Sequence, residues 1–288
     1  MIIARVEGGL GNQLFIYAAA RALALRTGAQ LKLDAWNGYR RDSFGRRYQL
    51  DEFNIAGALA EEAEVRRYRP ESRGFYWRRK LERRMPFSWR SVIEERSLFE
   101  PRLLELRPRG DVYLVGYWQR EEYFREQASA IRGELTLRRE PSAQTRALGE
   151  RMRQCESAFL HLRRIDYAYR LSAGYYAAAL KMLSERVRDP ILFVFGDDPE
   201  WAKRELPLPL GTQFVERNAD AANIEDFWLM TRCRHAIVAN SSFSWWGAWL
   251  NAEPDRIVVA PAAWGYRAAA ASGWLTVDAN SCGIGLKR

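Results

Sequence analysis

The chain has 288 residues, 48% of them hydrophobic, and a formal net charge of +9. This composition is typical of a globular protein with a sizeable core, and the length suits one large domain or two of ordinary size. Three scattered cysteines and two histidines, His161 and His235, argue against a disulfide framework and a Cys-based zinc site. No apolar run reaches the length of a membrane span and no signal-type leader opens the chain, so we expect a cytoplasmic protein.

The first half of the chain begins as a βαβ unit. Residues 2–6 form an apolar run typical of a buried strand, and residues 13–26 carry apolar side chains near helical spacing. Gly28 suits the end of that helix, and residues 30–33 resume as a strand. Further along, residues 112–115 predict another strand.

Residues 61–110 form a basic, helix-prone block between these strands. The block holds 14 Lys and Arg against 9 Asp and Glu, a net charge of +5. A basic surface fits an anionic partner such as a nucleotide, a nucleic acid or an acidic membrane. A solvated, arginine-rich surface with no partner accounts for the same composition, and the sequence leaves this choice open.

The second half of the chain alternates strands and helices again. Strands are predicted at residues 158–162, 191–195, 214–215, 236–239 and 257–260. Two alternating halves predict an α/β protein with two parallel-sheet domains, residues 1–150 and 151–288. The block 61–110 is then a basic helical insertion in the first domain.

Unusual polar and glycine-rich segments follow the predicted strands in both halves. They are GGLGN (residues 8–12), HLRRIDY (161–167), GDD (196–198) and NSS (240–242). In parallel α/β sheets, ligands bind beyond the carboxyl ends of the strands. The sequence therefore predicts a functional cleft lined by these segments.

Three glycines, Gly8, Gly9 and Gly11, stand between the first strand and the first helix. Gly9-x-Gly11 matches part of a dinucleotide fingerprint, but Leu14 occupies the third glycine position, which disfavours an NAD(P) enzyme. A tight strand-to-helix turn is one alternative. A loop whose backbone admits a phosphate or a sugar at the helix N-terminus is another.

The HLRRIDY segment places two arginines at a strand end. His161 ends the predicted strand, and Arg163 and Arg164 offer planar forks that match phosphate oxygens and stay charged. Asp166 is placed to orient either arginine. A surface Arg–Asp pair of little consequence is the alternative, which the apolar strand before the loop disfavours.

Two more strand ends carry groups that suit a phosphorylated ligand. Asp197 and Asp198 fit a general base, a ribose clamp or a metal site, although Asp198 before a proline is also typical of a helix cap. The chain has no D-x-D triplet and few His or Cys, so we expect no dedicated metal. Asn240, Ser241 and Ser242 precede a helix whose N-terminus suits an anion, or they merely cap that helix and its tryptophans form core.

Together these segments resemble the motifs of glycosyltransferase family 11, the α-1,2-fucosyltransferases, in their bacterial form. The matching stretches are GGLGNQLFIYA, GYWQREEYF, HLRRIDY, FVFGDDPEW and IEDFWLMTRCRHAIVANSSFSWWGAWLN, which span nearly the whole chain. The resemblance implies a GT-B architecture, with two Rossmann-like domains facing each other across the cleft that holds the active site. It also implies GDP-fucose as the donor, a galactose of an oligosaccharide as the acceptor, inversion to an α-linkage, and no metal or other cofactor.

The resemblance also assigns roles to residues of this chain. The catalytic donor loop, with the arginines on the pyrophosphate, comprises His161, Arg163, Arg164 and Asp166. The remaining donor contacts fall to Asp197, Asp198, Asn240, Ser241, Ser242 and Phe243. The glycine loop, with Gly9, Gly11, Asn12 and Gln13, would face the cleft from the opposite side and let its backbone approach the sugar or phosphate.

Three residues depart from the family pattern. Ile16 stands where Gln is usual, Ile165 where Gly is usual, and Gly196 where Ser is common. Ile165 matters most, because a β-branched residue restricts the loop beside the arginines.

The general base and the wider setting are left open at this point. Glu7, Asp34 and Asp166 are candidates for the base, and a loose, oxocarbenium-like transition state needs no strong base. We expect an enzyme of O-antigen or capsule synthesis that meets a lipid-linked acceptor at the inner face of the membrane, where the block 61–110 would dock on anionic lipid. The alternatives are a transferase for another nucleotide sugar and a non-catalytic nucleic-acid-binding protein; the second leaves the strand-end motifs unexplained.

Overall fold

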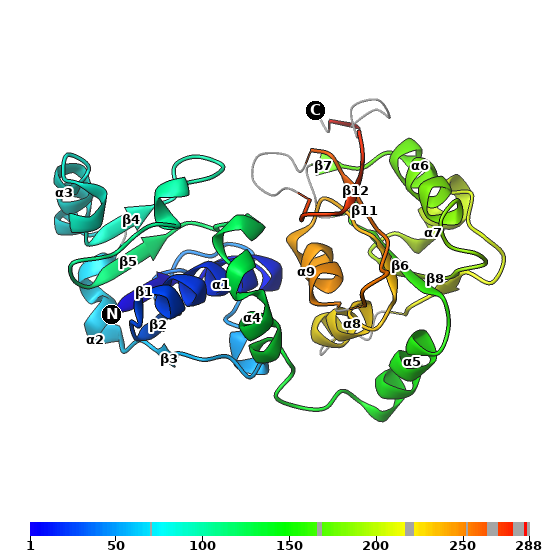
Figure 1. Ribbon diagram of the computed structural model, residues 1–288, viewed down its shortest axis with the longest axis horizontal. Helices are drawn as coiled ribbons and strands as arrows, with labels where there is room; N and C mark the ends of the chain where they lie inside the picture. The colour runs from blue at the N-terminus through cyan, green and yellow to red at the C-terminus, as the bar shows by residue number, and fades with distance from the viewer. Residues whose placement is uncertain are drawn as a thin grey trace. The chain divides into compact units, whose positions relative to one another are not determined.

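The computed structural model describes residues 1–69, 71–165, 169–216, 222–251, 253–263, 270–278 and 285–286. The chain divides into two compact units, Met1–Arg139 and Glu140–Arg288. Each unit contains a parallel sheet with helices packed on it, as the two alternating halves of the sequence predict (Figure 1). None of the described helices combines the length and the apolar character that crossing a membrane requires.

The first unit is built on a five-stranded parallel sheet with the order β3-β2-β1-β5-β4. β1 lies at its centre and pairs with β2 on one side and β5 on the other, so that Ile2 is opposite both Leu31 and Val112. Central position explains why three of the four residues of β1, Ile2, Ile3 and Ala4, are apolar and buried. In chain order the strands and helices of this unit are β1 (Ile2–Arg5), α1 (Leu10–Thr27), β2 (Leu31–Asp34), β3 (Ala58–Leu59), α2 (Glu62–Val65), α3 (Arg73–Glu82), β4 (Val92–Glu94), β5 (Val112–Val115) and α4 (Ala128–Glu134).

The turn from β1 into α1 uses glycine in two different ways. Gly8 has φ +80°, and a Cβ there would lie 2.7 Å from the Nδ2 atom of Asn12, so both conformation and space require glycine. Gly9 is the N-cap residue of α1 in an extended conformation, and a Cβ on it would meet nothing within 4 Å. The fold itself therefore explains Gly8 but leaves the glycine at position 9 without a structural reason.

The basic block 61–110 is not purely a helical insertion, and that expectation is corrected here. β4 lies inside the block and pairs in parallel with β5, with Ile93 opposite Leu114, so it completes the sheet. A strand of three residues offers too little alternation to be recognised within an arginine-rich sequence. The rest of the block is helical or irregular, including α3 and the 3₁₀ turn Phe87–Trp89.

The second unit is built on a six-stranded parallel sheet with the order β12-β11-β10-β6-β8-β9. Its first strand, β6, lies in the middle, and later strands are added outward on both sides, which is the strand order of dinucleotide-binding folds. The order reverses between β6 and β10, where such sheets bind their ligands. The elements are α5 (Ala143–Arg153), β6 (Ser157–Leu162), β7 (Tyr169–Arg170), α6 (Ala173–Ser184), β8 (Ile191–Gly196), α7 (Pro199–Glu205), β9 (Gln213–Phe214), α8 (Ala222–Met230), β10 (His235–Ile237), α9 (Ser242–Leu250), β11 (Val258–Pro261), β12 (Leu275–Val277) and β13 (Gly285–Leu286), which pairs antiparallel with β7.

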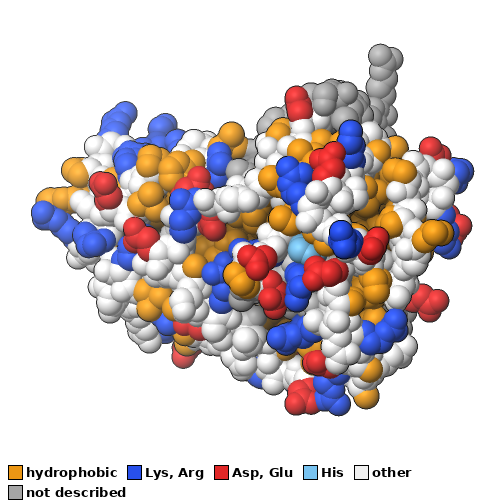
Figure 2. Space-filling view, turned by 45° about the vertical axis from the view of Figure 1, so that its right-hand side comes forward, with side chains coloured by type: hydrophobic (Ala, Val, Ile, Leu, Met, Phe, Trp, Pro, Cys, Tyr) orange, Lys and Arg blue, Asp and Glu red, His pale blue; other side chains and the backbone are white. Residues whose placement is uncertain are grey.

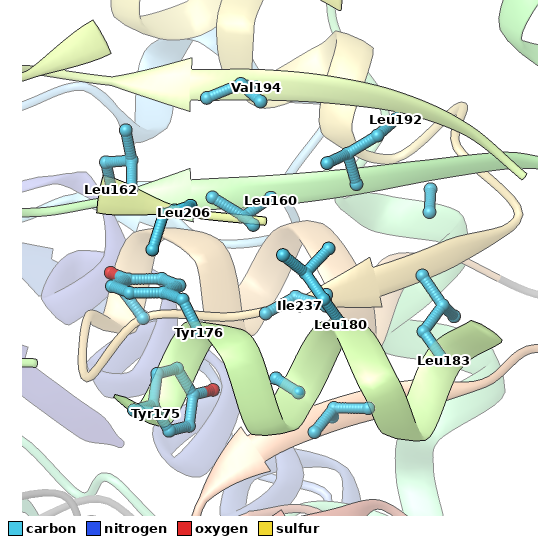
Figure 3. Close-up of a cluster of buried hydrophobic side chains, with 14 of the residues drawn as sticks. Leu160, Leu162, Tyr175, Tyr176, Leu180, Leu183, Leu192, Val194, Leu206 and Ile237 are labelled. Atoms are coloured by element: carbon cyan, nitrogen blue, oxygen red, sulfur yellow. The ribbon is translucent and has the colours of Figure 1, made fainter. Parts of the chain in front are cut away.

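Helix α6 packs its apolar face against this sheet and fastens its two central strands (Figure 3). The hydroxyl of Tyr175 donates to the carbonyl of Val238 at 2.6 Å, just past β10. The hydroxyl of the next residue, Tyr176, donates to the carbonyl of His161 at 3.1 Å, at the end of β6. Both tyrosines are fully buried, so α6 fixes the positions of the strand ends on either side of the reversal.

The boundary between the units precedes the expected one at residue 150, which falls inside α5. The hydroxyls of Ser142 and Thr145 donate to Glu225 of α8 at 3.1 and 2.5 Å. A Cβ on Gly149 would lie 2.4 Å from the ring of Trp228, so α5 approaches α8 closely. Because α5 packs on α8, it belongs to the second unit, and the division falls between Arg139 and Glu140.

Gly196 supplies a test of how closely β8 approaches β6. It has φ +137°, and a Cβ there would lie 2.3 Å from the carbonyl oxygen of Leu162, the residue opposite it in β6. We predict that Gly196→Ala lowers the free energy of unfolding by about 2 kcal/mol or more, measured by urea denaturation. Gly133→Ala, in helix α4 with open space around it, is the control and should stabilise by about 0.5–1 kcal/mol. An unchanged stability of Gly196→Ala would contradict the register of these strands.

Candidate active site

Asp197 ties the loop after β6 to the end of β8. Its Oδ1 accepts a hydrogen bond from the backbone N–H of Arg164 at 2.8 Å, and its Oδ2 accepts one from the N–H of Ile165 at 3.0 Å. The side chain of Asp197 therefore fixes the backbone of the arginine loop, a role that spacing in the sequence did not reveal. The exposed side chain of Ile165 leaves this loop intact, although its position is usually glycine in the family pattern.

Arg164 is held on three sides. Its Nε lies 3.4 Å from the Oδ2 of Asp198, and its Nη1 donates to the carbonyl of Leu171 at 3.1 Å. The guanidinium carbon lies 3.5 Å from the centre of the Trp201 ring, a cation–π contact. Asp198 also caps α7 by accepting from the N–H of Trp201 at 3.2 Å, as the sequence predicted. These three contacts fix the orientation of the guanidinium within the described part of the loop.

Arg163, the neighbouring arginine, carries the less compensated charge. Its side chain is half-buried and makes no ion pair or hydrogen bond with any residue that the structure describes. Asp166, predicted to orient one of the two arginines, lies outside the described residues. The loop therefore presents two cations of different character, Arg164 fixed by its neighbours and Arg163 without a partner in the described part of the chain.

The end of β10 lies across the strand-order reversal from this loop and leads into α9. Asn240 donates from its Nδ2 to the carbonyl of Tyr169 at 2.7 Å, whereas its Oδ1 is buried without a hydrogen-bond partner among the residues that the structure describes. A buried acceptor without a donor costs about 1–3 kcal/mol, so a ligand that donates there would stabilise the site. Ser241 is the N-cap residue of α9, and its hydroxyl makes no capping bond. The N-terminus of α9, which begins at Ser242, is a site with positive potential.

The rings of His161 and Phe243 pack against each other near the ends of β6 and β10. Their ring centres are 5.9 Å apart, and Phe243 packs in turn against Phe227 of α8. His161 is buried at the end of β6, and its carbonyl accepts from Tyr176. The predicted residues of the second unit that the structure describes thus cluster at the carboxyl ends of β6, β8 and β10.

The predicted glycine-loop residues of the first unit divide into two groups. Gly9, Gly11 and Asn12 lie at the first turn of α1, and the Oδ1 of Asn12 accepts from Gln119, just past β5, at 2.7 Å. β1 and β5 are neighbouring parallel strands, so the two segments that follow them lie at the same edge of the sheet. Gln13, in contrast, is fully buried and makes a different set of contacts.

Gln13 is a structural residue, which corrects its assignment to ligand contacts. Its Nε2 donates to the carbonyls of Gly8 and Arg47, and its Oε1 accepts from the N–H of Gln49 at 2.9 Å. These backbone bonds occupy both polar atoms and tie the loop around residue 48 to the glycine turn. The partners lie far along the chain, so no local pattern could have shown this role.

Asp34 is likewise structural, which removes it as a candidate base. Its Oδ1 accepts from the N–H groups of Trp36 and Asn37, and its Oδ2 accepts from the side chains of Asn37 and Tyr113 at 2.6 and 2.5 Å. It is completely buried. Burial and the neighbouring Asp34 carboxylate raise the pKa of Tyr113, which keeps that hydroxyl protonated and donating. Glu7 remains half-buried beside Arg5, 2.9 Å away.

Trp201 is a residue of the candidate site that reasoning from the sequence missed. It lies within the FVFGDDPEW segment, three positions after the N-cap Asp198, and its indole covers Arg164 while packing against Tyr176. An aromatic residue in the first turn after a strand-end acid is a signal that could have found it. Among the described residues, no group of three His, Cys, Asp or Glu side chains is placed to hold a metal ion.

Comparison with solved structures identifies the fold class. NodZ α-1,6-fucosyltransferase, known from Bradyrhizobium and crystallised with GDP, matches with a TM-score of 0.50 at 18% identity, over 85% of this chain and 90% of that one. A mutant of FUT1 from Arabidopsis thaliana matches with a TM-score of 0.50 at 12% identity, over 89% of this chain and 69% of that one. These likenesses confirm the predicted GT-B class with its two Rossmann-like domains.

Sequence comparisons agree with the motifs. The α-1,2-colitosyltransferase of Escherichia coli is 30% identical over 279 residues, covering 92% of both chains. The O-antigen biosynthesis glycosyltransferase WbnK of the same organism is 28% identical, covering 90% of this chain and 93% of that protein. The family model described as glycosyl transferase family 11 matches residues 101–272, which contain every strand-end motif of the second unit. The chain therefore belongs to glycosyltransferase family 11.

Proposed function

We propose that this glycosyltransferase transfers fucose from GDP-fucose to the 2-hydroxyl of a galactose in an oligosaccharide, with inversion, during O-antigen or capsule synthesis. The α-1,2 linkage and the O-antigen setting are supported by the similarity to the colitosyltransferase and to WbnK. The galactose acceptor is supported by a galactoside α-(1,2)-fucosyltransferase of Homo sapiens, 27% identical over 139 residues, 45% of this chain and 35% of that one.

One observation carries the proposal for the donor site. The fixed Arg164, Arg163 with no ion pair among the described residues, and the N-terminus of α9 all lie at the carboxyl ends of β6 and β10, where the strand order reverses. When the glycosidic bond to the donor breaks, the departing nucleoside diphosphate gathers negative charge. Cations and N–H groups that are already oriented stabilise this charge most in the transition state.

Asn240 extends the same argument to the rest of the donor. Its buried Oδ1 accepts no hydrogen bond from the described part of the chain, and it lies in the segment between β10 and α9. A nucleotide or sugar bears hydroxyl and amino groups that would satisfy it. We assign Asn240 to a polar group of the donor other than the diphosphate, because an acceptor oxygen repels phosphate.

GDP-colitose is the second candidate donor, because an α-1,2-colitosyltransferase is among the relatives. Colitose is fucose without its 3-hydroxyl, so the two donors differ by one hydrogen-bonding group. A site built to bond a hydroxyl rejects the analogue that lacks it by roughly 10⁴-fold, whereas an apolar site rejects an added hydroxyl only weakly. The relative rates with the two donors therefore identify the natural one.

The acceptor hydroxyl must lose its proton during the transfer. Of the two described candidates for the base, Asp34 is buried and fully bonded, which leaves Glu7 at the end of β1. We propose Glu7 as the base within the first unit, or a transition state loose enough to need none. Asp166 lies outside the described residues.

The first prediction separates the two arginines. Arg163→Ala should lower kcat/KM roughly 100- to 1000-fold while stability changes by less than about 0.5 kcal/mol, since no described contact is lost. Arg164→Ala should lower both activity and stability, because Asp198 and Trp201 lose their partner. Steady-state kinetics with GDP-fucose measure the activity, and urea denaturation measures the stability. Titration calorimetry adds the affinity of each variant for GDP. Wild-type kinetics for both variants would overturn the donor site.

The second prediction concerns donor choice and metal. Purified enzyme with lactose and a panel of β-galactosides should form fucosyl product from GDP-fucose, and product should persist in EDTA. GDP-colitose should react far more slowly, by roughly 10⁴-fold if the 3-hydroxyl is bonded. Faster transfer from GDP-colitose than from GDP-fucose would contradict the proposed donor but not the membership of family 11. Loss of turnover in EDTA would contradict the metal-independent mechanism.

The third prediction tests the base with a matched pair of carboxylates. Glu7→Gln should lower kcat roughly 100- to 10,000-fold with an unchanged affinity for GDP. Asp34→Asn should instead destabilise by about 1–3 kcal/mol, because its new amide faces the amide of Asn37, and retain kcat in the folded fraction. A normal kcat for Glu7→Gln would leave the transfer without a carboxylate base in the described part of the first unit.

A further inference from the structure

Helix α3 presents an unusual outer face. Trp77 and Leu81, one turn apart, are 53% and 62% exposed, and Tyr76, Met85 and Trp89 nearby are also exposed. Single exposed apolar residues are ordinary, but five within one helix and the turn after it form a concentrated apolar surface. Trp and Tyr side chains favour the boundary between water and a lipid bilayer.

This exposure does not come from a loosely attached helix. Phe75 is buried and packs edge-on against Tyr68 and Tyr113. Glu82 accepts hydrogen bonds from the N–H and hydroxyl of Ser91 and from the N–H of Val92. The inner face of α3 is therefore firmly fixed to the edge of the sheet at β4, and its outer face is held away from the unit's core.

Positive charge surrounds the exposed aromatic residues. Residues 73–90 contain seven Lys and Arg and one acidic residue, Glu82. Arg73, Arg78, Lys80 and Arg84 form no ion pair with any described carboxylate, and Lys80 lies over the Trp77 ring at 5.0 Å. Lys and Arg side chains (blue) lie beside hydrophobic ones (orange) at the left-hand end in Figure 2, the end where α3 lies in Figure 1.

The inner edge of α3 adds further cations. A small cavity of about 30 Å³ is lined by Arg79, Arg83, Arg90, Arg96 and Arg102, with two acids, Glu94 and Glu100, among them. Burial and, to a smaller degree, the nearby Arg102 lower the pKa of Arg90. The five arginines outnumber the two carboxylates, so positive charge is in excess around this cavity. An anionic group close to this cluster would relieve the repulsion.

We propose that α3 and the turn Phe87–Trp89 form a docking surface for an anionic lipid bilayer. Trp77, Leu81 and Trp89 would lie at the level of the headgroups, while the unpaired cations bind lipid phosphates. A nucleic acid fits the cations and the aromatic rings but leaves Leu81 and Met85 exposed to water. The surface does not involve the donor loop, so this proposal stands or falls independently of the proposed transfer reaction.

Vesicle sedimentation of the whole protein tests this surface. Wild type should bind equimolar phosphatidylethanolamine–phosphatidylglycerol vesicles at low salt and bind phosphatidylcholine vesicles much less. Arg73→Ser/Lys80→Ser/Arg84→Ser should bind the anionic vesicles roughly 100-fold more weakly. Trp77→Ser/Leu81→Ser should lose the part of the binding that persists at high salt, because that part is apolar.

Matched controls lie in the second unit. Lys203→Ser/Arg204→Ser removes exposed cations from α7, and Leu210→Ser removes a fully exposed leucine; both should bind vesicles as wild type does. All variants should keep wild-type circular dichroism and wild-type transfer to a soluble acceptor. Absent vesicle binding, equal binding to neutral vesicles, equal losses in the controls, or α3-dependent binding to an RNA oligonucleotide in place of vesicles would each overturn the proposal.

Discussion

The geometry of the candidate donor site depends on the contact between the ends of β6 and β8. Gly196 allows β8 to approach Leu162 without a Cβ, and the next residue, Asp197, receives the N–H groups of Arg164 and Ile165. The first motif aspartate thus acts on the backbone of the neighbouring loop, and the second, Asp198, acts on the arginine side chain. Residues of the segments HLRRIDY and FVFGDDPEW therefore form one hydrogen-bonded arrangement at the ends of β6 and β8.

This arrangement places charge where a diphosphate would need it without reorganisation at the moment of reaction. Arg164 is enclosed by Asp198, Leu171 and Trp201, so little side-chain freedom remains to be lost on binding. Tyr175 and Tyr176 fix the two strand ends on either side of the reversal. These contacts all lie within the second unit, and the proposed donor site adds Arg163, which has no ion pair among the described residues.

Local signals predicted much of this structure from the sequence. The strand Val112–Val115, the N-cap at Asp198 and the left-handed Gly28 at the end of α1 lie where they were expected, because each depends on neighbouring residues. Other features were not predictable, because they depend on residues far along the chain. They are the pairing of β4 with β5, the buried hydrogen bonds of Gln13 and Asp34, and the bonds from the backbone of Arg164 and Ile165 to Asp197. The boundary between the two units, after Arg139, was placed too late because α5 packs on α8. The residues near the boundary carry no sign of this long-range contact.

Hydrogen exchange measured with and without GDP is the most direct test of the central claim, that the strand ends around β6 and β10 hold the donor's diphosphate. The account predicts that GDP slows exchange in peptides covering residues 160–165 and 240–244, with no change in α3. The backbone amides of Arg164 and Ile165, already bonded to Asp197, should show protection even without nucleotide. Protection by GDP that is confined to other peptides would contradict the account.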